Sequence, residues 1–99
     1  MGMIQVTASE LRNRAEGLQN LNAQFKSKAS DLEAKEVALC SMWEGQTKTA
    51  FHNAFARDRQ QMDAFHGLLG QYVQALYEIA SAYEQAEARN TEIAAARSY

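Results

Sequence analysis

The chain has 99 residues, of which 46% are hydrophobic and 22% are charged, so its size fits one small domain and excludes a multidomain enzyme. Ten basic and twelve acidic residues give a net charge of −2, without the basic excess that nucleic acid or anionic membranes attract. Proline is absent, and Ala, Glu, Gln and Leu outnumber the β-branched residues. The composition therefore predicts an all-α chain.

The first predicted helix covers about residues 8–42. Its start is marked by a capping box, in which the Thr7 hydroxyl accepts a hydrogen bond from the amide of Glu10. Large apolar residues then recur at every seventh position and draw one stripe along the helix. This stripe contains Leu11, Leu18, Phe25, Leu32 and Leu39.

A turn at residues 43–46 and a second helix over about 47–88 are predicted next. Gly45 takes the left-handed conformation at little cost, and Thr47 is suited to cap the following helix. Apolar residues at alternating spacings of four and three form the second stripe. It contains Phe51, Phe55, Met62, Phe65, Leu69, Tyr72, Leu76 and Ile79. Residues 89–99 have few large apolar side chains, so we expect this tail to fray.

The short turn forces the two helices to lie antiparallel as a hairpin. Two helices cannot enclose a core, and further apolar residues flank both stripes. The sequence therefore predicts that two hairpins pair into a four-helix bundle, with the two stripes in the core of the dimer. Three glycines interrupt the helices, and they mark either a close approach of backbones or tolerated defects. These are Gly17, Gly67 and Gly70.

No residue pattern indicates catalysis or a bound cofactor. His52 and His66 lie two heptads apart, and neither has a metal-ligating residue four positions away. Cys40 and Ser41 lack an oriented base, and no glycine-rich phosphate loop is present. We therefore expect no enzyme, no metal, no cofactor, no nucleic-acid partner and no small-molecule substrate.

The turn between the two helices carries Trp43-x-Gly45, followed by Ala50-Phe51. A chain of this length, with two heptad-bearing helices and a central Trp-x-Gly turn, resembles the WXG family of small type VII secretion substrates. The resemblance covers essentially the whole chain. It implies an exported protein whose partner is the membrane-bound ATPase of the secretion system.

Members of that family commonly carry a Tyr-x-x-x-Asp/Glu export signal near the end of the second helix, and Tyr83-x-x-x-Glu87 matches it. The two residues lie one helical turn apart, and thus on one face. Counted from the turn, they lie beyond the start of the first helix. In an antiparallel dimer this overhang would lie beside Trp43 and Gly45 of the other copy, which predicts one composite recognition surface.

Residues 1–6 lack both the basic start and the apolar block of a signal peptide. We therefore expect synthesis in the bacterial cytoplasm and secretion without a cleavable signal peptide. The pairing partner is a second copy or a paralogous hairpin; both signal parts occur on this chain, which favours the homodimer. An alternative function is a cytosolic adaptor or chaperone-like partner that escorts a larger toxin to the same machine. A membrane-active effector is disfavoured by the near-neutral charge.

Overall fold

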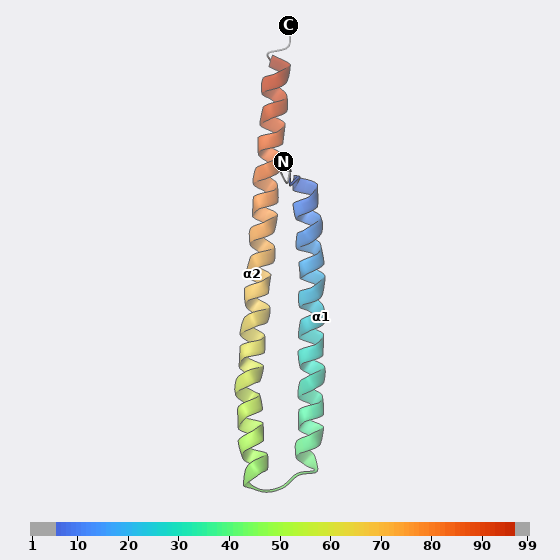
Figure 1. Cartoon of the computed structure of the whole chain (residues 1–99), viewed down its shortest axis with the longest axis vertical. Coiled ribbons are helices and arrows are strands. Elements are labelled where there is room, and N and C mark those ends of the chain that lie inside the picture. The colour runs from blue at the N-terminus through green and yellow to red at the C-terminus, as the bar shows by residue number, and fades with distance from the viewer. Residues whose placement is uncertain (1–5, 97–99) are drawn as a thin grey trace, which may run out of the picture.

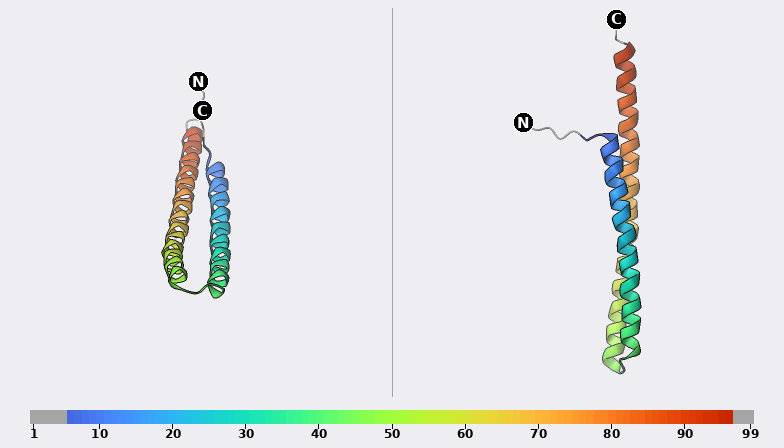
Figure 2. Two further views of the ribbon diagram at one scale, coloured as in Figure 1. Left: turned by 60° about the horizontal axis from the view of Figure 1, so that its bottom comes forward. Right: turned by 90° about the vertical axis from the view of Figure 1, so that its right-hand side faces the viewer.

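The computed structural model of the chain describes residues 6–96, with side chains for residues 6–91. Two helices, α1 (Ala8–Ser41) and α2 (Gln46–Ala96), lie side by side and are joined by a short turn (Figure 1). They run antiparallel and form a rod of 83 × 24 × 20 Å (Figure 2). No strand occurs in residues 6–96. The predicted all-α hairpin is confirmed.

Within the described range, neither helix combines the length and the apolar character needed to cross a membrane.

The start of α1 follows from its capping residue. The hydroxyl Oγ1 of Thr7 accepts a hydrogen bond from the amide of Glu10 at 3.1 Å, which satisfies one of the free amides of the first turn. At the other end, the amides of Met42 and Trp43 donate to the carbonyls of Leu39 and Cys40 at 3.1 and 3.3 Å. These bonds tighten the last turn of α1 directly before the chain reverses.

Gly45 makes the reversal into α2 possible. Its φ is 113°, a left-handed value that other residues rarely adopt. The helix begins at the next residue, and the amide of Thr49 donates to the Gly45 carbonyl at 3.4 Å. The predicted capping role of Thr47 is therefore wrong, because Thr47 already lies within the first turn of α2. The connection spans residues 42–45, one residue earlier than expected.

The second helix is longer than the sequence pattern predicted. It continues through Ala96 instead of ending near residue 88, so the expected fraying of residues 89–96 is wrong. Alanine has the highest helix propensity, and the three alanines at 94–96 favour continuation of the helix. The remaining residues of the predicted tail, 97–99, lie outside the described residues. As a result, α2 extends far past the start of α1 (Figures 1 and 2).

The surface between the two helices consists of small and polar side chains. Buried residues recur at every seventh position of α1, and the buried residues of α2 are also small or medium-sized. On α1 they are Ala8, Ala15, Asn22, Ala29 and Glu36, with Cys40 one turn further, and on α2 they are Val73 and Ala80. The amide Nδ2 of Asn22 donates to the carbonyl of His66 at 3.0 Å, which fixes the register at mid-length.

The two predicted stripes of large apolar residues do not occupy this seam. None of them is buried in the single chain, and Leu32, Phe65 and Tyr72 remain 46%, 47% and 53% exposed. The rings of Phe25 and Phe65 meet edge to face with centroids 5.4 Å apart, so the stripes lie side by side. We call the surface formed by these two stripes the apolar face. Small seam residues allow the helices to approach, and this displaces the larger side chains to one side.

The three glycines within the helices do not mark a close approach inside the hairpin. A Cβ atom added at Gly17, Gly67 or Gly70 would meet no other group within 4 Å. We therefore expect Gly67→Ala to raise the free energy of unfolding by about 0.5 to 1 kcal/mol, because alanine restricts the unfolded chain and favours helix. Urea unfolding followed by circular dichroism measures this change. A destabilised variant would indicate a contact with another molecule at Gly67.

Candidate functional site

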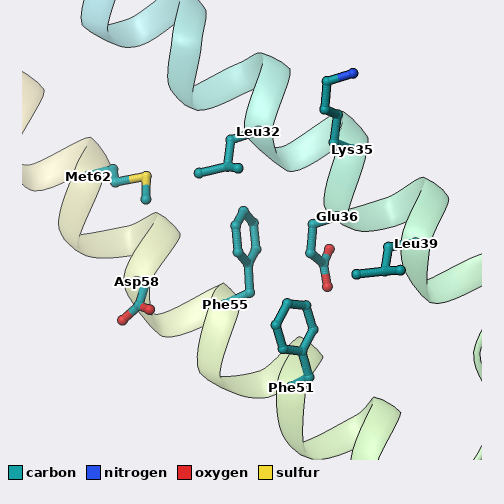
Figure 3. Close-up of a pocket in the computed structure, with 8 residues that line it drawn as sticks. All are labelled: Leu32, Lys35, Glu36, Leu39, Phe51, Phe55, Asp58 and Met62. Carbon is teal, nitrogen blue, oxygen red and sulfur yellow. The ribbon is translucent and has the colours of Figure 1, made fainter.

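The apolar face is hollowed near the turn. Side chains from both helices line this groove, and Phe51 and Phe55 of α2 point toward Leu32 and Leu39 of α1 (Figure 3). The carboxylate of Glu36 lies among these apolar groups. This groove is continuous with a row of half-exposed large side chains. Such a patch is typical of a protein–protein contact.

The opposite side of the hairpin carries ion pairs. Nε of Arg12 lies 2.5 Å from Oε1 of Glu84, and Nη2 donates to Oγ of Ser81 at 3.2 Å. The hydrogen bond from Arg12 holds the pKa of the Glu84 carboxyl below its ordinary value. These contacts join the start of α1 to α2 near the open end of the hairpin.

A second ionic group lies further along the same side. Nε of Arg59 lies 3.1 Å from Oε2 of Glu33, and Nη1 also pairs with Asp63 one turn away on α2. These ion pairs connect charged side chains of α1 and α2 within the chain.

Trp43 folds back from the turn onto the beginning of α2. Its ring centroid lies 5.6 Å from that of Phe51, with the ring planes inclined by 47°, and the side chain is half-buried. Phe51 also lines the groove, so the tryptophan continues the apolar face to its turn end. The left-handed backbone conformation of Gly45 allows the tight turn that contains Trp43.

The residues of the Tyr-x-x-x-Glu pattern lie at the other end of the hairpin. Tyr83 is 43% exposed and Glu87 is exposed, whereas Glu84 between them faces Arg12. Beyond this point α2 continues without α1 beside it (Figure 2). The structure therefore places Trp43 and Gly45 at one end of the molecule and Tyr83 and Glu87 near the other. A single chain does not bring the two patterns together.

A polar cluster at the turn end was missed by the sequence analysis. Sγ of Cys40 donates to Oε1 of Glu36 at 3.0 Å, and Nδ1 of His52 lies 2.7 Å from the same oxygen. These bonds, the one from Cys40 foremost, hold the pKa of the Glu36 carboxyl below its ordinary value, and Glu36 together with burial raises the pKa of the Cys40 thiol. The available signal was the four-residue spacing of Glu36 and Cys40. His52 is brought to them only by the register of the hairpin.

The fold and these surfaces define a small helical hairpin with one unpartnered apolar face, a tryptophan turn at one end and an overhanging helix at the other. The sequence matches the family model WXG100, described as proteins of 100 residues with WXG, over residues 3–88. The chain belongs to this family. No curated protein matches it by sequence.

Solved structures of similar proteins share the hairpin. The secreted protein ESXB from Bacillus anthracis str. Sterne is 25% identical and has a TM-score of 0.77, and the match covers 88% of this chain and 99% of that one. A second crystal form of ESXB is 26% identical, with a TM-score of 0.75 and coverage of 85% and 97%. EsxA from Geobacillus thermodenitrificans is 24% identical, with a TM-score of 0.75 and coverage of 90% and 96%, and supports the fold. The predicted WXG resemblance is confirmed.

Proposed function

We propose that this protein is a small secreted substrate of a type VII secretion system, and that the system's membrane ATPase recognises it as a homodimer. Membership of the WXG100 family and the similarity to a secreted protein support export. The protein acts by docking its surfaces and performs no chemical step. The partner classes are therefore a second copy of the hairpin and the export machine.

One observation carries the proposal: the large apolar side chains of both helices form a continuous exposed face that ends at the recognition turn. Two copies that pack these faces together form a four-helix bundle and remove the side chains from water. Burial of apolar surface contributes about 25 cal/mol per Å² in favour of the dimer, and the entropy lost on association opposes it. The ion-paired side of each hairpin remains in solvent.

Antiparallel pairing explains why the two sequence patterns lie at opposite ends. When two hairpins pack head to tail, the turn of each copy lies near the overhang of the other. Trp43 and Gly45 of one copy and Tyr83 and Glu87 of the other then form one surface at each end of the dimer. An unpaired chain lacks this composite surface, so the ATPase selects folded dimers.

The overhang provides a prediction that separates recognition from stability. We expect Tyr83→Ala and Glu87→Ala to abolish secretion while the melting temperature stays within about 8 °C, because neither residue is buried and a loss of about 1 kcal/mol shifts a domain of this size by no more than that. Immunoblots of culture supernatant and cell pellet measure secretion, and thermal unfolding measures stability.

Glu84→Ala is the matched control within the same helical turn. It removes a carboxylate that binds Arg12 instead of facing a partner, so we expect normal secretion and a small loss of stability from an exposed ion pair. Normal secretion of the Glu87→Ala variant would contradict the composite surface. That result would show that the Tyr83-x-x-x-Glu87 pattern occurs by chance on an amphipathic helix and is not an export signal.

Export itself is tested in the producing bacterium with and without the type VII membrane ATPase. We expect the full-length chain in the supernatant only when the ATPase is present, and without a requirement for a larger cargo protein. Retention in the cell while a larger protein is exported would overturn the proposal and establish the adaptor function. Secretion that continues without the ATPase would also overturn it.

A further inference from the structure

Three potential metal ligands meet where the end of α1 faces the beginning of α2. Glu36 and Cys40 come from successive turns of α1, and His52 comes from the second turn of α2. Their ligand atoms all lie within 4.8 Å of one another. The side chain of Glu36 is 3% exposed and Cys40 is also buried, whereas the imidazole of His52 is 54% exposed. The cluster thus has two enclosed ligands and one that is accessible from solvent.

Burial of this carboxylate is unusual in its surroundings. Glu36 occupies the seam position that Ala29 holds one heptad earlier, and apolar groups from both helices surround it (Figure 3). Removing an ionised carboxylate from water is expensive unless it is paired. Its two hydrogen-bonding neighbours both contact Oε1, one from each helix. Oxygen, sulfur and nitrogen donors therefore converge on one point.

We propose that Glu36, Cys40 and His52 bind a divalent transition metal of the zinc type. Carboxylate, thiolate and imidazole are the three protein ligand classes of zinc, and this mixture of donors excludes the hard cations Mg²⁺ and Ca²⁺, which take oxygen ligands. The fourth tetrahedral position is open to water or to another donor. As the metal–sulfur bond forms, the Cys40 thiol releases its proton to solvent, and no group is oxidised or reduced.

The distances between the three ligand atoms are compatible with metal binding after the Cys40 thiol loses its proton. Bond lengths of about 2.0 to 2.3 Å place neighbouring donors of a tetrahedral zinc about 3.2 to 3.6 Å apart. Sγ of Cys40 and Oε1 of Glu36 are 3.0 Å apart, and Nδ1 of His52 and the same oxygen are 2.7 Å apart, so each pair needs to separate by less than 1 Å. The remaining pair, the Cys40 sulfur and the His52 nitrogen, is at most 4.8 Å apart and needs to approach to the tetrahedral distance. Rotation of the exposed imidazole accommodates this change.

A metal at this position would connect α1 to α2 directly beside the turn. Trp43 lies three residues after Cys40, and its amide donates to the Cys40 carbonyl at 3.3 Å. Metal binding would therefore hold the end of α1 from which the tryptophan projects. The proposed site is independent of the export proposal, because it concerns binding by the isolated chain.

Cobalt titration of the purified full-length chain tests the site. The chain is reduced, treated with a chelator and titrated with Co²⁺, whose absorption reports thiolate ligation and tetrahedral geometry, and Zn²⁺ is then added as a competitor. We expect one ion per chain, a cobalt–thiolate charge-transfer band, and displacement of cobalt by zinc. Metal also raises the melting temperature, because it binds only the folded arrangement of the three ligands.

Single variants assign the ligands. We expect Cys40→Ser to abolish the charge-transfer band, and Glu36→Gln and His52→Asn each to weaken binding by more than the roughly 10- to 100-fold cost of losing an outer-shell group. His66→Asn is the control, because it changes the other histidine of the chain and should leave binding unaltered. Circular dichroism confirms that each variant retains its helices.

Absence of the band in the parent chain would overturn the proposal. So would binding that His52→Asn and Glu36→Gln leave unchanged, since that result would assign the metal to the cysteine alone. If Glu36→Gln loses its helical structure, the melting-temperature shift of the folded Cys40→Ser variant decides the question. A shift as large as that of the parent chain would also overturn the site.

Discussion

Phe65→Glu is expected to convert the dimer into a monomer. Phe65 is 47% exposed in the single chain, so a carboxylate there remains hydrated in the monomer, whereas pairing of the apolar faces would bury it. An uncompensated buried charge costs about 3 to 5 kcal/mol, which raises the dissociation constant by at least about a hundredfold. Size-exclusion chromatography with light scattering measures the mass, and circular dichroism reports whether the helices persist.

Val37→Glu is the corresponding control on α1. Val37 is 56% exposed and lies one turn after Glu33, on the ion-paired side of the hairpin. The same substitution of a large apolar residue by glutamate should therefore leave the dimer intact. A Phe65→Glu chain that stays dimeric, or a Val37→Glu chain that dissociates, would show that the apolar face is not the pairing surface.

Trp43→Ala is expected to abolish secretion without unfolding the protein. The tryptophan is half-buried and contacts Phe51, so its truncation should cost less than the roughly 3 to 5 kcal/mol of emptying a fully enclosed aromatic site. The composite surface, in contrast, loses its largest side chain. Secretion is measured by immunoblot of the supernatant, and stability is measured by urea unfolding of the purified dimer.

Met42→Ala tests whether any change at the turn has this effect. Met42 precedes the tryptophan and is 81% exposed, so its loss should alter neither secretion nor stability appreciably. If Trp43→Ala unfolds the chain, the tryptophan is primarily a structural residue. A folded Trp43→Ala protein that is secreted normally would remove the turn from the recognition surface.

The sequence was sufficient to predict the hairpin but not which side chains fill its seam. The alanine row of α1 and the leucine row beside it both recur at every seventh residue, so periodicity alone does not show which row faces α2. Side-chain size decides it, because Ala15 and Ala29 allow a closer approach than Leu18 and Leu32. The length of α2 was underestimated because helix propensity sustains residues 89–96, although α1 does not run beside them (Figure 1).

The positions of the two parts of the candidate recognition surface, at opposite ends of the hairpin, could also be predicted from the sequence. The Trp43 turn and the Tyr83 overhang follow from motif spacing and from the unequal helix lengths. The cluster around Glu36 was not predicted, because the pairing of Glu36 with His52 depends on the register of two helices joined by a glycine turn. A sequence pattern within one helix does not predict which residues of the other helix lie opposite it.

Co-expression of two defective chains tests the composite surface most directly. A Trp43→Ala chain and a Glu87→Ala chain should each fail to leave the cell when expressed alone. When the two form an antiparallel heterodimer, one end of the bundle combines an intact Trp43 turn with an intact overhang from the other copy. We predict that both tagged chains then appear together in the culture supernatant. If both chains remain in the cell although they co-purify as a dimer, the recognition signal lies within a single chain, and a composite surface built from two copies is contradicted.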